Sequence, residues 1–336
     1  MAKIMSTLVG QGKGKIGAEV LYRANGEQYL RARAISVANP QSNSQMYQRL
    51  AIVSAAKLSA QLQGIIDHSF ESLPYGTKSV RYFNSLATRA FKAAIMHPTG
   101  LLKRYAPVLP KGAGYATAVD GLQISQGTLA TPGIDTQVGI AEGFPSAFAK
   151  VSGIITGQTT VANLTLGQFL TAIGCELTDQ LTFIFGVPVH EGVAYDSENE
   201  YGTILTEIIR VNFKSDAALT ATLITNGGFN PAIIDADKST NVDELALRAD
   251  DEDLRIEFEP ASGVVSLVSV IRSAFVGGSW RRSNAELHCS SRFMDEHDGA
   301  AVGLEVGMNS LPNVIATYRK TSSKVEDRFL NQEDNA

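Results

Sequence analysis

The spacing of the apolar residues changes near residue 100, and this change restricts the chain to a mixed fold. From about Thr77 to His97 the apolar residues recur every three or four positions, which is the period of an amphipathic helix. Beyond Tyr115 they occur in short runs separated by turn residues, a pattern typical of antiparallel sheets. The sequence therefore predicts an α+β protein in which an N-terminal hairpin and two helices precede a mainly antiparallel β-sandwich, Ig-like or jelly-roll-like.

A β-hairpin is expected near the start of the chain. Residues 19–23 and 28–33 are rich in strand-forming residues and flank Asn25-Gly26, the strongest short-range signal for a two-residue hairpin turn. Arg31 and Arg33 are two residues apart, so we expect both on one face of the second strand.

Two helices are expected after this hairpin. Asn39-Pro40 ends the second strand, and Ser42 followed by Gln45 has the spacing of a capping box, which favours a helix start. The second helix, from about Thr77 to His97, has one apolar face and one basic face. At about 100° per residue, its four basic side chains fall within an arc of roughly 80°. These are Lys78, Arg81, Arg89 and Lys92.

Positive charge is concentrated in the first third of the chain. Residues 1–111 contain 15 Lys and Arg against 4 Asp and Glu, whereas residues 112–336 contain 14 against 30. The net charge of −5 therefore hides a basic part and an acidic part. Because summed charge steers association, this division indicates a basic module that meets an anionic partner. A solvent-exposed helix face without a partner is the simpler interpretation of the same residues.

Composition and periodicity also suggest where the chain divides. We expect a basic hairpin-plus-helices module over residues 1–99 and a linker rich in Gly, Pro and Lys over residues 100–116. The β-sandwich is expected over residues 117–318, followed by a polar tail over residues 319–336.

Three segments of the second half predict particular kinds of strand. Apolar residues alternate with others at 181–185 and at 209–213, so each of these strands is expected to bury one face only. The segment from Val264 to Val276 is almost continuously apolar or small, which favours a central strand covered on both faces. Gly277-Gly278 is expected to turn the chain into a further strand that carries the only tryptophan, Trp280.

Motifs for cofactors and catalysis are weak in this sequence. Gly12, Gly14 and Gly17 have the spacing of a dinucleotide-binding loop, but Gly17 leads into a strand where that motif requires a helix. The patterns of serine hydrolases, of zinc proteases and of the phosphate-binding P-loop are absent. We therefore expect no enzymatic activity and no cofactor.

Metal sites are not expected either. The acidic run that starts at Asp235 resembles the first half of a calcium loop, but Thr240 and Ala246 stand where that loop requires glycine and glutamate. A looser cation site that uses Asp243 or Glu244 stays open. The residues His288, Cys289 and His297 match no zinc spacing, and the two cysteines are expected to be buried thiols.

No run of 18 apolar residues occurs, so no membrane span is expected. The first 17 residues lack the order of charges and apolar residues that a signal peptide has.

At Gly14-Lys15-Ile16-Gly17, in the hairpin that follows and at Asn39-Pro40, the chain resembles a group of phage and prophage proteins that is common in phages of Bacteroides-type hosts and in small tailless phages. The group has a glycine-rich start, a hairpin with the pattern YxRxxGxxYxR and a helix start with the pattern NPxTxxQ. Here Arg23, Gly26, Tyr29 and Arg31 keep the spacing of that hairpin, and Ser42 replaces the usual threonine of the helix start. The resemblance covers residues 10–95 and, more weakly, residues 265–287. It implies a virion-associated protein, and it carries over no enzymatic activity.

From these observations we expect a bacteriophage structural or assembly protein of the virion, assembled in the host cytoplasm. Its basic module would contact packaged nucleic acid, such as phage DNA, or an acidic capsid surface, and its β-domain would bind other virion proteins or further copies of itself. The alternatives are a nucleic-acid-binding protein outside the particle and a self-associating interaction module with exposed hairpin edges. The expected contact residues are Lys13, Lys15, Arg23, Arg31, Arg33, Lys78, Arg81, Arg89 and Lys92.

Overall fold

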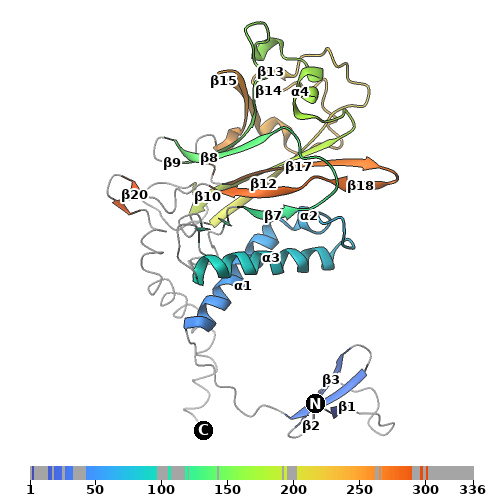
Figure 1. Cartoon of the computed structure of the whole chain (residues 1–336), viewed down its shortest axis with the longest axis vertical. Coiled ribbons are helices and arrows are strands. Elements are labelled where there is room, and N and C mark those ends of the chain that lie inside the picture. Colours follow the sequence, from blue (N-terminus) through green and yellow to red (C-terminus); the bar gives the residue numbers. More distant parts are fainter. Residues whose placement is uncertain are drawn as a thin grey trace. The chain divides into compact units, whose positions relative to one another are not determined.

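The chain forms two compact units, Met1–Ser42 and Asn43–Ala336 (Figure 1). The computed structural model describes residues 43–96, 121–141, 144–190, 203–261, 265 and 267–289. It also describes short strands at residues 2–3, 14–16, 19–24, 27–32, 105–106, 118–119, 193–194, 296–297 and 300–301. The expected boundaries differ from this division, because residues 43–96 belong to the same unit as the sheets that follow them.

The first unit contains a four-stranded antiparallel sheet with the order β1-β4-β3-β2. Its strands are β1 (Ala2–Lys3), β2 (Gly14–Ile16), β3 (Glu19–Ala24) and β4 (Glu27–Ala32). Ala24 pairs with Glu27, so two residues connect β3 to β4 and the predicted hairpin is confirmed.

The second unit begins with three helices. They are α1 (Asn43–Gln61), α2 (Gln63–Ile66) and α3 (Thr77–Met96). Helix α1 begins directly after Ser42, where the capping-box pattern places its start. Helix α3 covers the predicted range to within one residue. Gly76 precedes it with φ +89°, a conformation that glycine adopts without strain.

A seven-stranded antiparallel sheet lies beneath the helices. Its main order is β11-β10-β17-β19-β7, with β12 beside β10 and β18 beside β17. These strands are β7 (Leu122–Ser125), β10 (Gln180–His190), β11 (Val193–Ala194), β12 (Thr203–Asn212), β17 (Leu267–Val276), β18 (Ser279–Arg282) and β19 (Ala285–Cys289). The predicted central strand is confirmed, because β17 lies between β10 and β19 and residues 267–271 are all buried.

Strand β10 differs from the prediction. We expected residues 181–185 to bury one face only, yet residues 181–186 are all buried. The reason is that β10 is an interior strand of a sheet covered on both sides. Ile184 belongs to the core beneath the helices, whereas Phe183 and Phe185 belong to the core on the other side.

A second antiparallel sheet covers the opposite face of the first. Its order is β15-β16-β9-β8, formed by β8 (Asp135–Ala141), β9 (Phe144–Val151), β15 (Leu245–Asp250) and β16 (Asp253–Phe258). The polar stretch from Asp235 to Asp253 contains β15. Leu245 and Leu247 are buried against the first sheet and explain this strand.

Smaller elements complete the unit. They are α4 (Leu166–Ile173), β13 (Ile224–Thr225), β14 (Gly228–Phe229), three single-turn helices (Val161–Asn163, Val242–Glu244 and Glu259–Ala261) and the short strand pairs β5 (Tyr105–Ala106) with β6 (Ala118–Val119) and β20 (Glu296–His297) with β21 (Ala300–Ala301). Helices, first sheet and second sheet therefore form three layers with two apolar cores between them (Figure 1). The predicted α+β class with an antiparallel β-sandwich is confirmed.

Candidate nucleic-acid or partner interface

Helix α3 packs on the sheet with its apolar face. Phe83, Ala87 and Phe91 are fully buried and share a core with residues of α1, β7, β17 and β19. The hydroxyl of Ser79 donates a hydrogen bond to the carbonyl oxygen of Ile66, and this bond ties the start of α3 to α2. The amphipathic pattern of the sequence therefore fixes which side of α3 faces away from the core.

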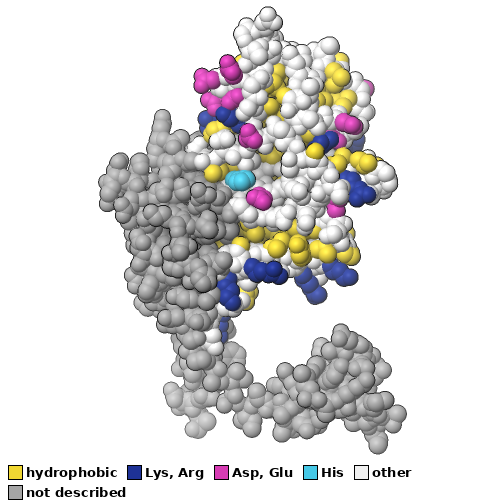
Figure 2. Space-filling model, viewed as in Figure 1, with side chains coloured by type: hydrophobic (Ala, Val, Ile, Leu, Met, Phe, Trp, Pro, Cys, Tyr) yellow, Lys and Arg dark blue, Asp and Glu magenta, His cyan; other side chains and the backbone are white. Residues whose placement is uncertain are grey.

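The opposite face of α3 carries the four predicted cations. Lys78, Arg81, Arg89 and Lys92 are all exposed. The guanidinium of Arg89 donates a 3.3 Å hydrogen bond to the hydroxyl of Ser85, which lies one turn away in the middle of this face. Figure 2 shows Lys and Arg side chains along the edge of the molecule that α3 forms, while Asp and Glu side chains gather at the far end of the same unit.

These four cations have no carboxylate partner among the residues that the structure describes. Helices α1, α2 and α3 contain no Asp or Glu, so none of the three helices supplies a carboxylate to the cations of α3. Tyr82, at the border of the basic face, is 39% exposed, and its ring packs edge-on against Phe70 at 5.0 Å. We name the surface formed by Lys78, Arg81, Ser85, Arg89 and Lys92 the α3 basic face.

The cations of the β-layers are held differently. All nine Lys and Arg side chains in the described part of residues 121–289 have a partner. Six pair with carboxylates: Lys150, Lys238, Arg248, Arg255, Arg272 and Arg281. The other three donate to backbone carbonyl oxygens: Arg210, Lys214 and Arg282.

The remaining predicted contact residues belong to the first unit or lie outside the described residues. Lys15, Arg23 and Arg31 lie on β2, β3 and β4. Lys15 pairs with Val20, and Val20 pairs with Arg31, so the two cations occupy one register row of the sheet. Lys13 and Arg33 lie outside the described residues.

The loop between α2 and α3 is anchored to the sheet by a carboxylate. Glu71 accepts a hydrogen bond from the backbone N–H of Arg282 and a 2.9 Å hydrogen bond from the hydroxyl of Thr128. Its third partner is the guanidinium of Arg281, 3.5 Å away. Burial alone raises the pKa of the Glu71 carboxyl, but the hydrogen bonds outweigh it and the pKa is lowered. Glu71 is therefore a structural anion that fixes the position of α3.

Two titratable groups near this loop are also shifted. Burial, helped by the charge of Arg282, lowers the pKa of His68, so its ring is neutral at physiological pH. Burial lowers the pKa of the Arg282 guanidinium to about 10, and it stays charged at neutral pH. The ring nitrogen Nδ1 of His68 forms a hydrogen bond with the carboxylate of Asp67, and the ring stacks on that of Tyr75 with 5.8 Å between the centroids. These two contacts hold the His68 ring in place.

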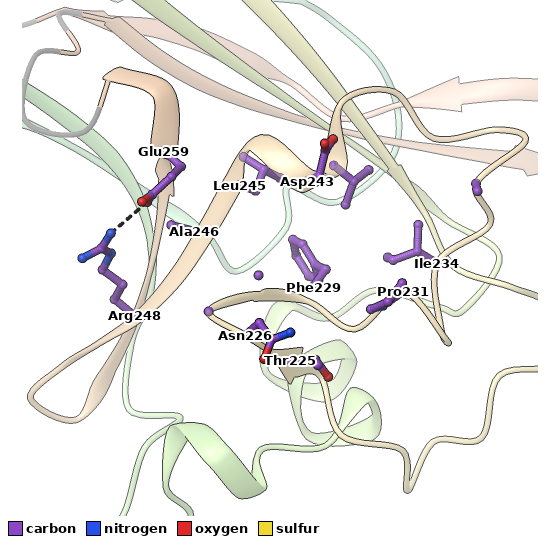
Figure 3. A pocket seen from close by; sticks show the side chains of 14 residues that line it. Thr225, Asn226, Phe229, Pro231, Ile234, Asp243, Leu245, Ala246, Arg248 and Glu259 are labelled. Atoms are coloured by element: carbon purple, nitrogen blue, oxygen red, sulfur yellow. Dashed lines mark hydrogen bonds and ion pairs between the residues drawn. The ribbon is translucent and has the colours of Figure 1, made fainter.

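An open cleft of about 610 Å³ lies elsewhere in the second unit (Figure 3). Phe229, Pro231, Ile234 and Leu245 form its apolar part. At one end, the guanidinium of Arg248 forms a 2.8 Å ion pair with Glu259. No sequence pattern indicates this cleft, because its residues come from β13, β14 and β15, from the loops between them, and from the turn of helix that starts at Glu259.

The described residues contain no group of three or more His, Cys, Asp or Glu side chains placed to hold a metal ion. Asp235, the first residue of the calcium-like run, pairs with Lys238 at 3.0 Å. Cys175 is half-buried, and burial raises the pKa of its thiol to about 11, so it is protonated at neutral pH. No described helix has the length and hydropathy that crossing a bilayer requires.

Comparison with known protein families, curated proteins and solved structures finds no match to this chain.

Proposed function

We propose that this chain is a non-enzymatic structural or assembly protein of a bacteriophage particle and that its α3 basic face contacts nucleic acid. The observation that carries the nucleic-acid contact is that Lys78, Arg81, Arg89 and Lys92 are exposed on one face without a carboxylate partner among the described residues. The phage assignment is supported by the sequence resemblance of residues 10–95 and 265–287.

The dimensions of the α3 basic face suit a polyanion. Lys78 and Lys92 are fourteen residues apart, which is about 21 Å along a helix. Duplex DNA carries about one charge per 1.7 Å of its axis, so a phosphate lies within reach of each cation over that length. Lys and Arg contacts to phosphates do not read bases, and the proposal is therefore binding without sequence preference.

Counterion release determines how strongly salt weakens this binding. Each phosphate that a cation neutralises releases counterions, and the affinity falls with salt in proportion to the number of such contacts. An acidic protein surface binds the same cations, but it lacks the condensed counterions of a nucleic acid. A steep dependence on salt therefore favours nucleic acid over an acidic capsid surface.

The test is a gel-shift and fluorescence-anisotropy titration of the full chain with single-stranded and double-stranded DNA at low and at raised salt. We expect binding at low salt that weakens steeply as salt rises. No binding to either DNA at low salt would overturn the nucleic-acid contact.

A matched pair of variants then locates the contact. The double variant Arg81→Gln with Lys92→Gln removes two of the four charges of the α3 basic face. The control Lys214→Gln with Lys238→Gln removes two charges that already have partners in the β-layers. We expect the first variant to lose about tenfold or more in affinity at low salt, and the control to bind as the wild type does. Equal losses of affinity in both variants would show that binding depends on the net charge of the chain and not on the α3 basic face.

A further inference from the structure

Tyr82 lies beside the cations of the α3 basic face. At about 100° per residue, its side chain is rotated around the helix axis by about 20° from Arg89 and by about 40° from Lys78. Along the axis it lies about 6 Å from Lys78 and about 10 Å from Arg89. Figure 2 shows hydrophobic side chains, the class in which Tyr is coloured, directly beside the Lys and Arg side chains of α3. An aromatic ring therefore lies between two positions that suit phosphates.

The ring of Tyr82 is both exposed and ordered. Its side chain packs edge-on against Phe70, with 78° between the ring planes, so Phe70 covers at most one face of the Tyr82 ring. Phe70 is itself 1% exposed, and its backbone pairs with Gln126, which directly follows β7. The Tyr82 ring thus rests on a ring that the core fixes. A ring that is already ordered loses little conformational entropy when a second ring stacks on it.

Tyr75 is more exposed than Tyr82, but its surroundings do not suit a nucleotide. It is 76% exposed, and its ring stacks on that of His68, which covers one face. Its hydroxyl donates a hydrogen bond to the carboxylate of Asp67. The His68 ring is neutral at physiological pH, so it does not cancel the charge of Asp67. This carboxylate repels a phosphate next to Tyr75, whereas the charged neighbours of Tyr82 on α3 are cations.

We propose that the α3 basic face binds single-stranded nucleic acid, with its cations on the phosphates and one unpaired base stacked on Tyr82. In a duplex the neighbouring base pairs cover the faces of each base, so only an unpaired base offers a face to Tyr82. Every base has such a face, and the contact therefore adds affinity without sequence preference. This inference rests on the proposed nucleic-acid contact and names the form of nucleic acid that the contact selects.

The test compares strands with and without bases. Anisotropy of the full chain is measured with an oligothymidylate, with an abasic strand of the same length and with a duplex of that length. Since stacking on one aromatic side chain strengthens binding by about fivefold or more, we expect the wild type to prefer the oligothymidylate over the abasic strand by that factor. An oligouridylate of equal length distinguishes RNA from DNA as the source of the strand, because RNA carries the 2′-hydroxyl.

Four variants locate the stacked base. Tyr82→Ala removes the ring and is expected to bring the affinities for the oligothymidylate and the abasic strand to within about twofold of each other. Tyr82→Leu keeps an apolar side chain on Phe70 without a ring and should lose the preference as well, which separates stacking from packing. Tyr82→Phe should keep it. The matched control Tyr75→Ala removes a more exposed tyrosine and is expected to keep the preference of the wild type.

The dependence on salt separates Tyr82 from the cations. Tyr82 neutralises no phosphate, so Tyr82→Ala should lower the affinity for the oligothymidylate at every salt concentration and keep the slope of log K against log salt. Lys78→Gln should instead make that slope shallower by about 0.7. A shallower slope in Tyr82→Ala would show that the substitution acts through the cations and would overturn the stacking assignment.

Duplex binding gives a further comparison. Each phosphate contact contributes a slope of about 0.9 in duplex DNA and about 0.7 in a single strand, so raised salt weakens duplex binding faster. We therefore expect the oligothymidylate to be preferred over the duplex at raised salt. Tighter binding of the duplex under these conditions would overturn the selection of single strands.

The remaining outcomes distinguish this inference from the proposed function. Equal wild-type affinities for the oligothymidylate and the abasic strand would overturn the stacked base and leave the phosphate contact intact. Absence of binding to every strand and to the duplex would overturn both. If Tyr75→Ala loses the preference as Tyr82→Ala does, the assignment of the base to Tyr82 is wrong.

Discussion

The cations of α3 and the cations of the β-layers differ in what surrounds them. Each of the nine described Lys and Arg side chains in residues 121–289 donates to a carboxylate or to a backbone carbonyl oxygen of its own chain. The four of α3 are exposed and pair with no described carboxylate. A paired cation already interacts with a group of its own chain, whereas an unpaired cation is available to bind an external anion.

This contrast separates two roles that a count of charges cannot separate. Pairs in the β-layers position strands and loops, as Arg272 does when it joins Asp179 to the carbonyl oxygen of Gly174. We therefore expect substitutions in the β-layers to change stability and leave polyanion binding intact. Substitutions on the α3 basic face should do the reverse.

The largest expected effect is on the pair of Arg272 and Asp179, whose side chains are 12% and 3% exposed. Asp179→Ala leaves the guanidinium buried without its carboxylate and is expected to cost about 3–5 kcal/mol in the free energy of unfolding. Denaturant unfolding measures this loss, and DNA binding of the folded variant should equal that of the wild type. A loss below about 1 kcal/mol would contradict the structural role of this pair.

The next effect comes from giving α3 the kind of partner that the β-layers have. Ser85→Glu places a carboxylate one turn from both Arg81 and Arg89, at spacings that favour ion pairs on a helix. We expect DNA affinity at low salt to fall by about tenfold, with stability unchanged or raised by a few tenths of a kcal/mol. Ser85→Gln is the uncharged control. If it weakens binding as much as Ser85→Glu does, the loss does not come from charge.

A smaller effect concerns the pH dependence of stability at Glu71. Its folded pKa lies below its ordinary value of 4.5, so its contribution is present above that pH and is lost as the pH falls through the lowered value. Glu71→Gln keeps an oxygen for the N–H of Arg282 but carries no charge. We expect thermal unfolding of this variant to shift less between pH 7 and pH 3 than that of the wild type. Equal shifts of the unfolding temperature in the variant and the wild type would contradict a stabilising charge on Glu71.

The smallest effect is expected at an exposed pair. Lys238 is 71% exposed and lies 3.0 Å from Asp235. Lys238→Gln is expected to change the free energy of unfolding by less than about 1 kcal/mol, because solvent screens such pairs. A larger loss, measured by denaturant unfolding, would mean that this acidic loop depends on its cation.

Local patterns in the sequence predicted much of the fold. The periodicity of residues 77–97 located α3 and its exposed face, and the apolar run at 264–276 located the central strand β17. Asn25-Gly26 and Gly277-Gly278 marked two hairpins, because these turns require residues that adopt positive φ. Such features depend on neighbours in sequence, so one sequence suffices to find them.

Features that depend on distant residues were missed. The one-sided burial expected for β10 was wrong, because the helices cover a face that the strand pattern alone does not reveal. The pairing of Arg281 with Glu71 joins residues far apart in the chain and has no sequence signature.

The sequence also contains a local signal for α4. This helix starts at a capping box formed by Thr165 and Gln168 and ends at Gly174, which has a left-handed conformation.

The most direct test of the contrast is the slope of binding affinity against salt. The variant with Lys78, Arg81, Arg89 and Lys92 all changed to Gln should be compared with the wild type on single-stranded DNA by anisotropy. If each cation neutralises one phosphate, the slope of log K against log salt becomes shallower by about 2.8 units, while the unfolding free energy stays within about 0.5 kcal/mol. Identical slopes in a folded variant would show that the α3 basic face is a solvated surface without a nucleic-acid partner.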